Sequence, residues 1–454
     1  ERPAGFVSYR EIGNEDLFGV LKDMELANLV RGKSSREILL ITGIYAREDG
    51  TGDSGVIRDA PQQLLVEVLA KELEKNYSFA LFVAERGTAT KEVVYVLERQ
   101  GFIRPHMADE NDKRTIYMVD MHEPLMFLHN LDTTIKEPFA SNPAVLDAVE
   151  KNHKKLQIAM TKLYPGNLVL SLSSGIMYHR LVDRITALND VPREPLVPRR
   201  LGKNMCVPFG KILRGKVVPN TVTKTLHTDK VYEPDLNSFT IEPFPYYSPL
   251  KSQIETIKSF DRPVILVDDL VHTANRLQVL VPQLREDGIP IKKVVVGVLS
   301  GYGRDLMQCL KVPVESIYSM PNLRQWFVES TLYPFIGGDT VRREEMKVAG
   351  LQPSINMILP YATPRLSGCS REALVEFSAC CIENSRDLFQ VLEAEYRKMY
   401  AKNLTLSRLS EAVILPLCPD KGSCMEYDEN LAASVYLEND LETLWRMKEF
   451  LIKG

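Results

Sequence analysis

The sequence predicts an α/β protein of several domains, with a doubly wound parallel sheet near its centre and a mostly helical C-terminal region. Three observations support this fold class. Strand-like apolar segments alternate with amphipathic helices through the first 320 residues. From about Asn322 that alternation largely stops and long helical patterns follow. A chain of 454 residues is also too long for one hydrophobic core, so two or three domains are expected.

The amino-acid composition of the chain bears on which kinds of partner it is expected to have. The chain has 56 basic and 60 acidic side chains and a net charge of −4, which gives no electrostatic reason to expect nucleic acid. No apolar run reaches the ~18 residues that would span a bilayer, so no membrane partner is expected. The seven cysteines are scattered without C-x-x-C pairs, which predicts reduced thiols in a cytoplasm rather than disulfides or a cysteine zinc site.

The beginning of the chain leads to a further expectation. It starts with Glu1 instead of Met, and a strand is predicted almost at once, from Gly5. We therefore expect that the sequence belongs to a longer chain with an N-terminal region upstream. The sequence leaves a homodimer open.

Residues 1–130 read as a first α/β domain. The helix over 90–99 is capped by Thr90 and ended by Gly101. A Thr, Pro, Ser and Asn-rich stretch at 131–143 then marks the boundary. The predicted strands lie at 38–45, 79–84 and 115–121, and a further helix at 62–75.

Residues 144–320 read as the second domain and 321–454 as the third. The second begins with a helix from Ala144, and residues 189–250 are irregular, rich in prolines and basic side chains. Strands are predicted at 167–172, 263–267 and 293–299, and helices at 176–188, 276–285, 372–400 and 440–452.

The most specific motif is the stretch 264–276. Four apolar strand formers end in Asp268 and Asp269, followed by a short polar turn into a helix. The carboxyl end of such a strand opens into the ligand crevice of a parallel sheet, and the following helix start favours a phosphate. Two acids beside a phosphate need hydroxyl groups or a metal ion, and a ribose diol with Mg²⁺ supplies both. The alternative is that the acids only cap the helix.

This stretch resembles the phosphoribosyl-pyrophosphate motif of type I phosphoribosyltransferases, and the resemblance covers about residues 144–320. It implies that Asp268 and Asp269 hold the ribose and, with the substrate, Mg²⁺. It implies a pyrophosphate loop at Ser173, Ser174 and Gly175, and a flexible loop or hood at 203–230. The 5′-phosphate would be wrapped by Leu270, Val271, His272, Thr273, Ala274, Asn275 and Arg276. In the basic segment, the candidate pyrophosphate contacts are Lys211, Arg214 and Lys224.

The motif departs from the family pattern at its end. Ala274 stands where the family has glycine, and only glycine reaches a positive φ cheaply. Arg276 takes the last hydroxyl position, where it could strengthen phosphate binding or fill the site. Two functions therefore stay open. One is transfer of the phosphoribosyl group to a nitrogenous acceptor with release of pyrophosphate, and the other is sensing of such a ligand without chemistry.

The first 130 residues resemble GNAT-type N-acetyltransferases, since the helix ending at 98–102 looks like the family's closing "lGF" signature. This resemblance implies that an acyl-CoA pyrophosphate binds at the start of the helix from Gln62. The family's spaced glycines are missing there. Of the residues in their place, Asp59 would repel a phosphate and Pro61 lacks a backbone amide to donate to it. Leu97 replaces the frequent catalytic tyrosine. Both an inert domain and an active acetyltransferase stay open.

The histidines outside the motif and the basic segment are expected to be structural residues rather than ligands. They are His106, His122, His129, His153 and His179.

Overall fold

The computed structural model divides into two compact units, each assembled from three separated segments. The consecutive boundaries predicted from the sequence did not include such interleaving. The first unit comprises Glu1–Phe127, Gln157–Leu172 and Ser319–Trp326, and the second Leu128–Leu156, Ser173–Tyr318 and Phe327–Gly454. The structure describes residues 5–34, 37–46, 59–85, 90–105, 114–198, 200–245, 247–343, 348, 350–364, 366–421 and 426–453.

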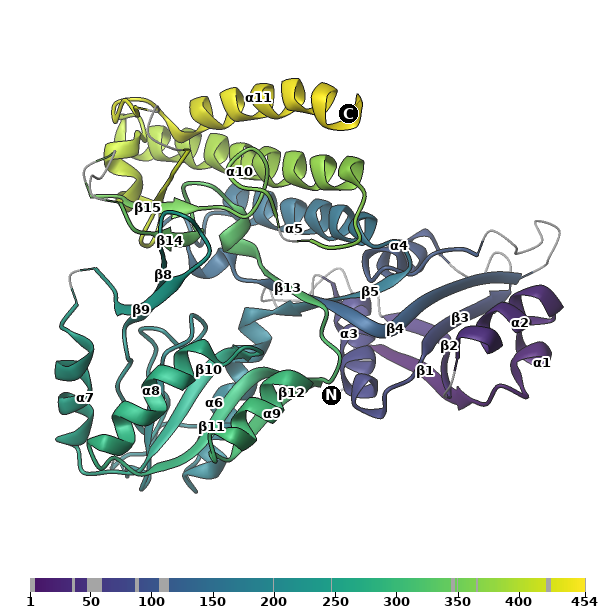
Figure 1. The fold of residues 1–454 in the computed structure, drawn as a ribbon, viewed down its shortest axis with the longest axis horizontal. Helices are drawn as coiled ribbons and strands as arrows, with labels where there is room; N and C mark the ends of the chain where they lie inside the picture. Colours follow the sequence, from purple (N-terminus) through teal and green to yellow (C-terminus); the bar gives the residue numbers. More distant parts are fainter. Residues whose placement is uncertain are drawn as a thin grey trace. The chain divides into compact units, whose positions relative to one another are not determined.

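The sheet of the first unit is mixed (Figure 1). Its strands are β1 (Gly5–Ile12), β2 (Ile38–Ala46), β3 (Phe79–Glu85), β4 (Arg114–His129), β5 (Asn167–Ser173) and β13 (Gln325–Val328). The strand order is β1-β2-β3-β4-β13, and β5 also pairs with β4. β2 and β3 are parallel, whereas β1 and β4 run antiparallel to their neighbours β2 and β3. Ile38–Ile41 of β2 and Phe79–Phe82 of β3 are buried, as expected of central strands.

The helices of the first unit are α1 (Leu17–Leu21), α2 (Met24–Lys33), α3 (Ala60–Glu72), the 3₁₀ turn η1 (Leu73–Lys75) and α4 (Lys91–Arg99). The predicted cap is present, because the Thr90 hydroxyl accepts a hydrogen bond from Val93 N at 3.3 Å. After α4 the chain turns at Gly101 with φ +89°, where a Cβ would lie 2.1 Å from the Asn167 carbonyl oxygen. Both the backbone angle and this close approach to β5 require glycine.

The second unit contains a five-stranded sheet with parallel strands at its centre. Its strands are β6 (Met205–Pro208), β7 (Val222–Thr223), β10 (Val264–Val271), β11 (Ile291–Ser300) and β12 (Val314–Met320), in the order β12-β11-β10-β6-β7. β10 runs parallel to both β11 and β6. Val264 and Leu266 pack in one apolar cluster with the helix that follows β10. Ile265 and Val267 are equally buried and point to the opposite face, since side chains alternate along a strand.

Helices lie beside this sheet (Figure 1). They are α6 (Ser174–Leu188), α7 (Leu250–Lys258), α8 (Asn275–Glu286) and α9 (Gly301–Cys309). The cluster around Leu266 draws apolar side chains from α7, α8 and α9. Met177 of α6 approaches Gly297 of β11, where a Cβ would lie 2.1 Å from its sulfur. The observed architecture is therefore α/β with several domains, as predicted.

Several elements differ from the expectations. The strand predicted at 167–172 forms β5, which pairs with β4 and does not enter the parallel sheet. β10 extends past the predicted end at Val267, because Leu270 and Val271 continue the ladder opposite Val298 and Leu299. The candidate phosphate loop therefore starts at His272 and not at Leu270. Parts of the irregular segment 189–250 form strands of two to five residues, which are too short to show periodicity.

A second sheet completes the second unit. Its strands are β8 (Thr228–Tyr232), β9 (Phe239–Pro243), β14 (Asp339–Val341), β15 (Gln352–Ile355) and β16 (Leu417–Pro419), in the order β16-β15-β14-β8-β9. The sheet thus joins the basic middle segment to the C-terminal region, because β8 of that segment runs parallel to β14. The three C-terminal strands have three or four residues each and were not predicted.

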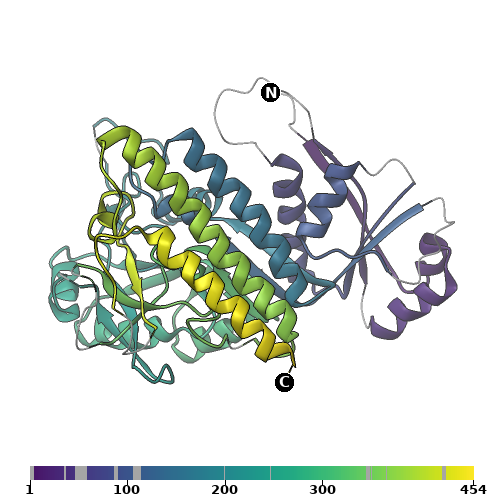
Figure 2. The same cartoon turned by 90° about the horizontal axis from the view of Figure 1, so that it is seen from above.

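Long helices dominate the C-terminal region, as predicted. The remaining elements are η2 (Leu131–Thr133), α5 (Pro143–Leu163), η3 (Glu329–Leu332), α10 (Arg371–Tyr400), η4 (Leu406–Glu411) and α11 (Ala433–Lys453). Figure 2 shows α10 running between α5 and α11. The side-chain amides of Asn152 and Asn384 each donate to the other residue's backbone carbonyl, at 2.8 and 3.0 Å. These bonds fix α5 against α10.

The helices and the cysteines bear on where in the cell the protein is expected. Among the described residues, no helix is both long and apolar enough to cross a membrane. The six cysteines in the described ranges carry free thiols, while Cys424 and His106 lie outside those ranges. Localisation in a cytoplasm stays a prediction.

Candidate functional site

The acid pair lies on the central strand β10, within the second unit. β6 pairs with β10 as far as Pro208, opposite Val267, and then leaves the ladder just before Asp268. The chain after β6 turns across the pair, because Phe209 N donates to the Val267 carbonyl oxygen at 3.0 Å. The early end of β6 therefore leaves Asp268 and Asp269 facing a loop instead of a strand.

That loop binds Asp269 through its backbone. Lys211 N donates to Asp269 Oδ2 at 2.6 Å and Ile212 N donates to Asp269 Oδ1 at 3.0 Å. Gly210 lies directly over the pair, since a Cβ there would be 2.5 Å from Asp269 Oδ1 and 2.8 Å from Asp268 Oδ1. The close approach of backbone and carboxylates explains the glycine at this position.

Asp268 is held in a mixed electrostatic environment. Its side chain is 12% exposed, and Arg276 Nη1 lies 3.9 Å from its Oδ1. Burial raises the pKa of Asp268 to about 7, the Arg276 guanidinium opposes that rise, and the neighbouring Asp269 carboxylate adds to it. Arg276 also donates to the Phe209 carbonyl oxygen at 3.3 Å. The arginine that departs from the family pattern thus points back toward the acid pair.

The turn after β10 is the candidate phosphate loop. Ala274 adopts a left-handed conformation with φ 51° and ψ 22° at the start of α8, and no side chain caps that helix among the residues that the structure describes. Its first-turn amides are therefore open to an anion. Asn275 Nδ2 donates to the Thr273 hydroxyl at 2.8 Å, and His272 Nδ1 lies 2.8 Å from the Ser300 hydroxyl. A non-glycine residue in this conformation costs roughly 1–2 kcal/mol.

Two basic side chains of the loop after β6 converge on this region. Burial and the nearby Arg214 charge lower the pKa of Lys211, whereas Asp229 of β8 and Asp339 of β14 favour its charged form. The Arg214 guanidinium lies over the Phe244 ring at 4.2 Å. Arg214 Nη2 is buried without a hydrogen-bond partner among the described residues. A buried, unsatisfied guanidinium nitrogen is a natural donor to an anionic ligand.

The other predicted contacts are Lys224 and the turn formed by Ser173, Ser174 and Gly175. Lys224 is exposed just after β7. The Ser173 hydroxyl caps α6 by accepting from Ile176 N at 3.4 Å, and Ser174 Oγ lies 3.5 Å from Asp132 Oδ1. Gly175 lies in the first turn of α6. The hydroxyls of Ser173 and Ser174 thus link the turn to its own helix and to Asp132, whereas the backbone amide of Lys211 bonds to Asp269.

Some residues of the site were missed in the sequence. Asp229 and Asp339 come from strands of five and three residues, separated widely along the chain, so no local pattern marks them. The stacked rings of His227 and Tyr247, with centroids 3.9 Å apart, were also missed. Arg214 interacts electrostatically with both Asp269 and Tyr247. Gly210 could have been noticed as the single glycine between β6 and the basic residues.

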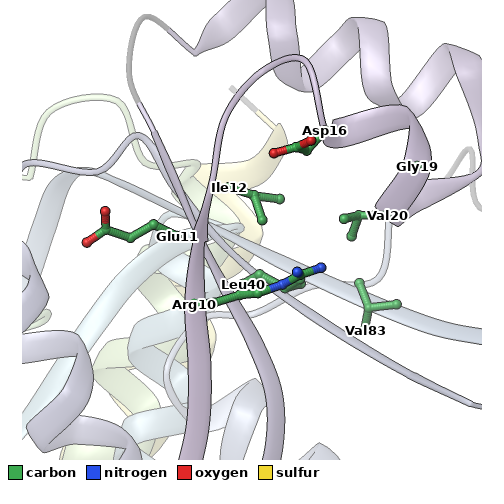
Figure 3. Close-up of a pocket in the computed structure, with 8 residues that line it drawn as sticks. All are labelled: Arg10, Glu11, Ile12, Asp16, Gly19, Val20, Leu40 and Val83. Atoms are coloured by element: carbon green, nitrogen blue, oxygen red, sulfur yellow. The ribbon is translucent and has the colours of Figure 1, made fainter.

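The first unit offers different features. At the start of α3, where acyl-CoA was expected, Asp59 is paired with Arg99 at 2.5 Å, and the preceding glycine-rich loop lies outside the described residues. A pocket of ≈ 430 Å³ lies instead beside β1 and α1 (Figure 3). Its lining includes Arg10, Glu11 and Asp16. The pocket therefore does not coincide with the expected acyl-CoA position, and the acetyltransferase resemblance stays a prediction.

Comparison with known proteins finds a slight structural similarity and no match in sequence. No family model and no curated protein matches the sequence. Among solved structures, a purine phosphoribosyltransferase from Pyrococcus horikoshii Ot3 is similar to part of the chain. It has 13% sequence identity and a TM-score of 0.23, over 34% of this chain and 87% of that one. A likeness this slight supports no function by itself, so the ligand must be argued from the residues.

Proposed function

We propose that the second unit binds phosphoribosyl pyrophosphate at Asp268 and Asp269 and transfers its phosphoribosyl group to a nitrogenous acceptor, releasing pyrophosphate. The observation that carries the proposal is the acid pair at the carboxyl end of a central parallel strand, followed by a left-handed turn and an uncapped helix start. Ligands of open parallel sheets bind at this position. The carboxylates would accept hydrogen bonds from the ribose hydroxyls, and the amides at the start of α8 would bind the 5′-phosphate.

The donor set also fits a magnesium ion that arrives with the substrate. Carboxylate oxygens are ligands that Mg²⁺ prefers. Asp269 accepts one amide bond on each oxygen, so both oxygens retain acceptor capacity for a hydroxyl or a water. When bound, the ion would offset the negative charge of the pyrophosphate. Asp268 and Asp269 would hold it through the substrate.

The departing pyrophosphate would meet the basic loop after β6. Lys211 and Arg214 are the two candidates there, and the buried Nη2 of Arg214 has unused donor capacity among the described residues. Cationic groups aimed at a leaving anion stabilise the charge that develops in the transition state. The exposed Tyr247 ring, which interacts electrostatically with Arg214, offers a surface on which a flat acceptor could stack.

A second candidate is a protein that binds the same ligand without transferring it. The position of Arg276 favours this alternative, because its guanidinium lies near Asp268 and neutralises part of the acid pair. A permanent cation there would lower the need for a bound metal ion. Turnover of the ligand separates the two functions.

The test is calorimetric titration of phosphoribosyl pyrophosphate with Mg²⁺ into the full chain. The double substitution Asp268→Asn/Asp269→Asn should abolish binding. Asp305→Asn, an exposed carboxylate on α9 of the same unit, is the matched control and should bind like the wild type.

The outcomes are distinct. Binding that survives in the double variant would place the ligand elsewhere, and no binding to the wild type would refute both functions. Release of pyrophosphate during a screen of nitrogenous bases would support the transferase. Binding without release would favour the sensor.

A further inference from the structure

Two histidines and a glutamate meet in the second unit, away from the acid pair. His129 ends β4, His153 lies on α5 and Glu329 opens the turn η3. Each can offer one ligand atom, and these atoms all lie within 4.8 Å of one another. Three elements that are distant in the chain therefore bring two imidazoles and one carboxylate to a single point.

Glu329 is the most unusual member of the group. Its side chain is 0% exposed, and Oε1 bonds to His153 Nδ1 at 2.5 Å. Oε2 is buried without a hydrogen-bond partner among the described residues and lies 3.9 Å from His129 Nδ1. Leaving a buried carboxylate oxygen without a hydrogen-bond partner is energetically unfavourable. A cation between Glu329 and His129 would satisfy it.

The imidazoles are placed to share one ion. Their rings cross nearly edge to face, with centroids 4.3 Å apart and an interplanar angle of 77°. The His129 and His153 side chains retain 14% and 20% exposure, so an ion can reach them from solvent.

We propose that His129, His153 and Glu329 bind a divalent transition-metal ion of the zinc class. Two imidazoles and a carboxylate match the donor set of zinc sites that keep a fourth position open, whereas Mg²⁺ and Ca²⁺ prefer oxygen ligands alone. Tetrahedral zinc with bonds of about 2.0–2.2 Å places its ligands about 3.3 Å apart. The observed spacings, from 2.5 Å to at most 4.8 Å, bracket that value, so side-chain shifts of about 1 Å would close the site.

The competing explanation is a purely structural network in which Glu329 only orients the two histidines. The two explanations differ in a measurable way. A structural network predicts weak or no zinc binding, whereas the proposed site predicts one ion for each chain. The acid pair takes no part in either, so the outcome is independent of phosphoribosyl pyrophosphate binding.

The test uses the tag-free full chain, dialysed against a chelator and titrated with Zn²⁺ by calorimetry. We expect one site, weakened more than about 100-fold in His129→Gln and in His153→Gln, because loss of an outer-shell partner alone already costs about 10- to 100-fold. His179→Gln is the matched control, since His179 is an exposed histidine of the same unit, bonded to Arg193. It should bind Zn²⁺ like the wild type.

A second measurement uses only the wild-type protein, so it does not require that the variants fold. The visible spectrum of Co²⁺ added to the wild type should show tetrahedral absorption, and anomalous X-ray scattering should locate the ion between the three side chains. Failure to bind one equivalent, equal affinity in the His153→Gln variant, or an anomalous peak elsewhere would each overturn the proposal.

Discussion

Replacing Gly210 by alanine tests the packing of the loop against the acid pair. A Cβ at this position would lie 2.5 Å from Asp269 Oδ1 and 2.8 Å from Asp268 Oδ1, which is closer than real carbon–oxygen contacts allow. Gly210 is not among the glycines with a positive φ, so the backbone itself tolerates alanine. The effect of the substitution should therefore be steric.

The expected size follows from the bonds that must give way. To clear the new methyl group, Asp269 Oδ1 has to move by nearly 1 Å, which breaks its bond from Ile212 N at 3.0 Å. A hydrogen bond to a charged group contributes about 1.5–3 kcal/mol. The reduced entropy of the unfolded chain offsets about 0.4–1 kcal/mol of that loss. We expect Gly210→Ala to lower the free energy of unfolding by about 1–2 kcal/mol.

Urea denaturation of the full chain measures this change, and calorimetry with phosphoribosyl pyrophosphate and Mg²⁺ should show binding weakened at least about tenfold. Gly32→Ala in α2 is the control. No atom of the described residues lies within 4 Å of the point that its Cβ would occupy, and helix propensity predicts a gain of up to about 1 kcal/mol. A Gly210→Ala protein as stable as the wild type would refute the close contact, whatever the ligand proves to be.

Four further substitutions address the site. Ala274→Gly should raise the free energy of unfolding by up to about 1 kcal/mol in urea denaturation, because glycine relieves the left-handed backbone strain. The control Ala394→Gly, on the exposed face of α10, should lower it by about 1 kcal/mol. An equal loss of stability in both variants would contradict backbone strain at Ala274. The pKa of Asp268 in the folded chain, about 7, lies above its ordinary 3.8, so the folded state retains a proton that the unfolded chain releases. The free energy of unfolding should therefore fall as pH rises from about 4 to about 7, and a slope unchanged in Asp268→Asn would contradict this. Arg276→Gln should raise the pKa of Asp268 further, which a shift of that pH window to higher values would reveal. Lys211→Met should weaken binding of phosphoribosyl pyrophosphate about tenfold or more. The free energy of unfolding should change little, since burial already disfavours the charged form of Lys211. Unchanged affinity in calorimetry would show that Lys211 takes no part in the site.

The sequence was most informative where one strand is buried on both faces. The run Val264–Val267 predicted β10, and its two acids marked the candidate site before any contact was known. Ala274 stands where the resembled family has glycine, and the structure gives it the left-handed conformation that glycine reaches most easily. These features depend on neighbours along the chain, which a single sequence records well.

The features that the sequence did not predict depend on contacts between residues that are distant in the chain. The direction of Arg276 is set by the Phe209 carbonyl and by Asp268, and no pattern around residue 276 reveals it. Asp229 and Asp339 meet Lys211 only because short strands of two regions share one sheet. His153 and Glu329 were unremarkable in the sequence for the same reason.

The interleaving of the two units has a consequence for biosynthesis. Residues Ser319–Trp326 belong to the first unit, so its sheet cannot be completed until more than two thirds of the chain has left the ribosome. The parallel sheet of the second unit lies entirely between those segments apart from the end of β12, and can assemble while the N-terminal part still lacks its last strand. A ribosome-bound chain halted near residue 310 should therefore expose the β4 edge that β13 later covers, and an unpaired strand edge of this kind is prone to aggregation.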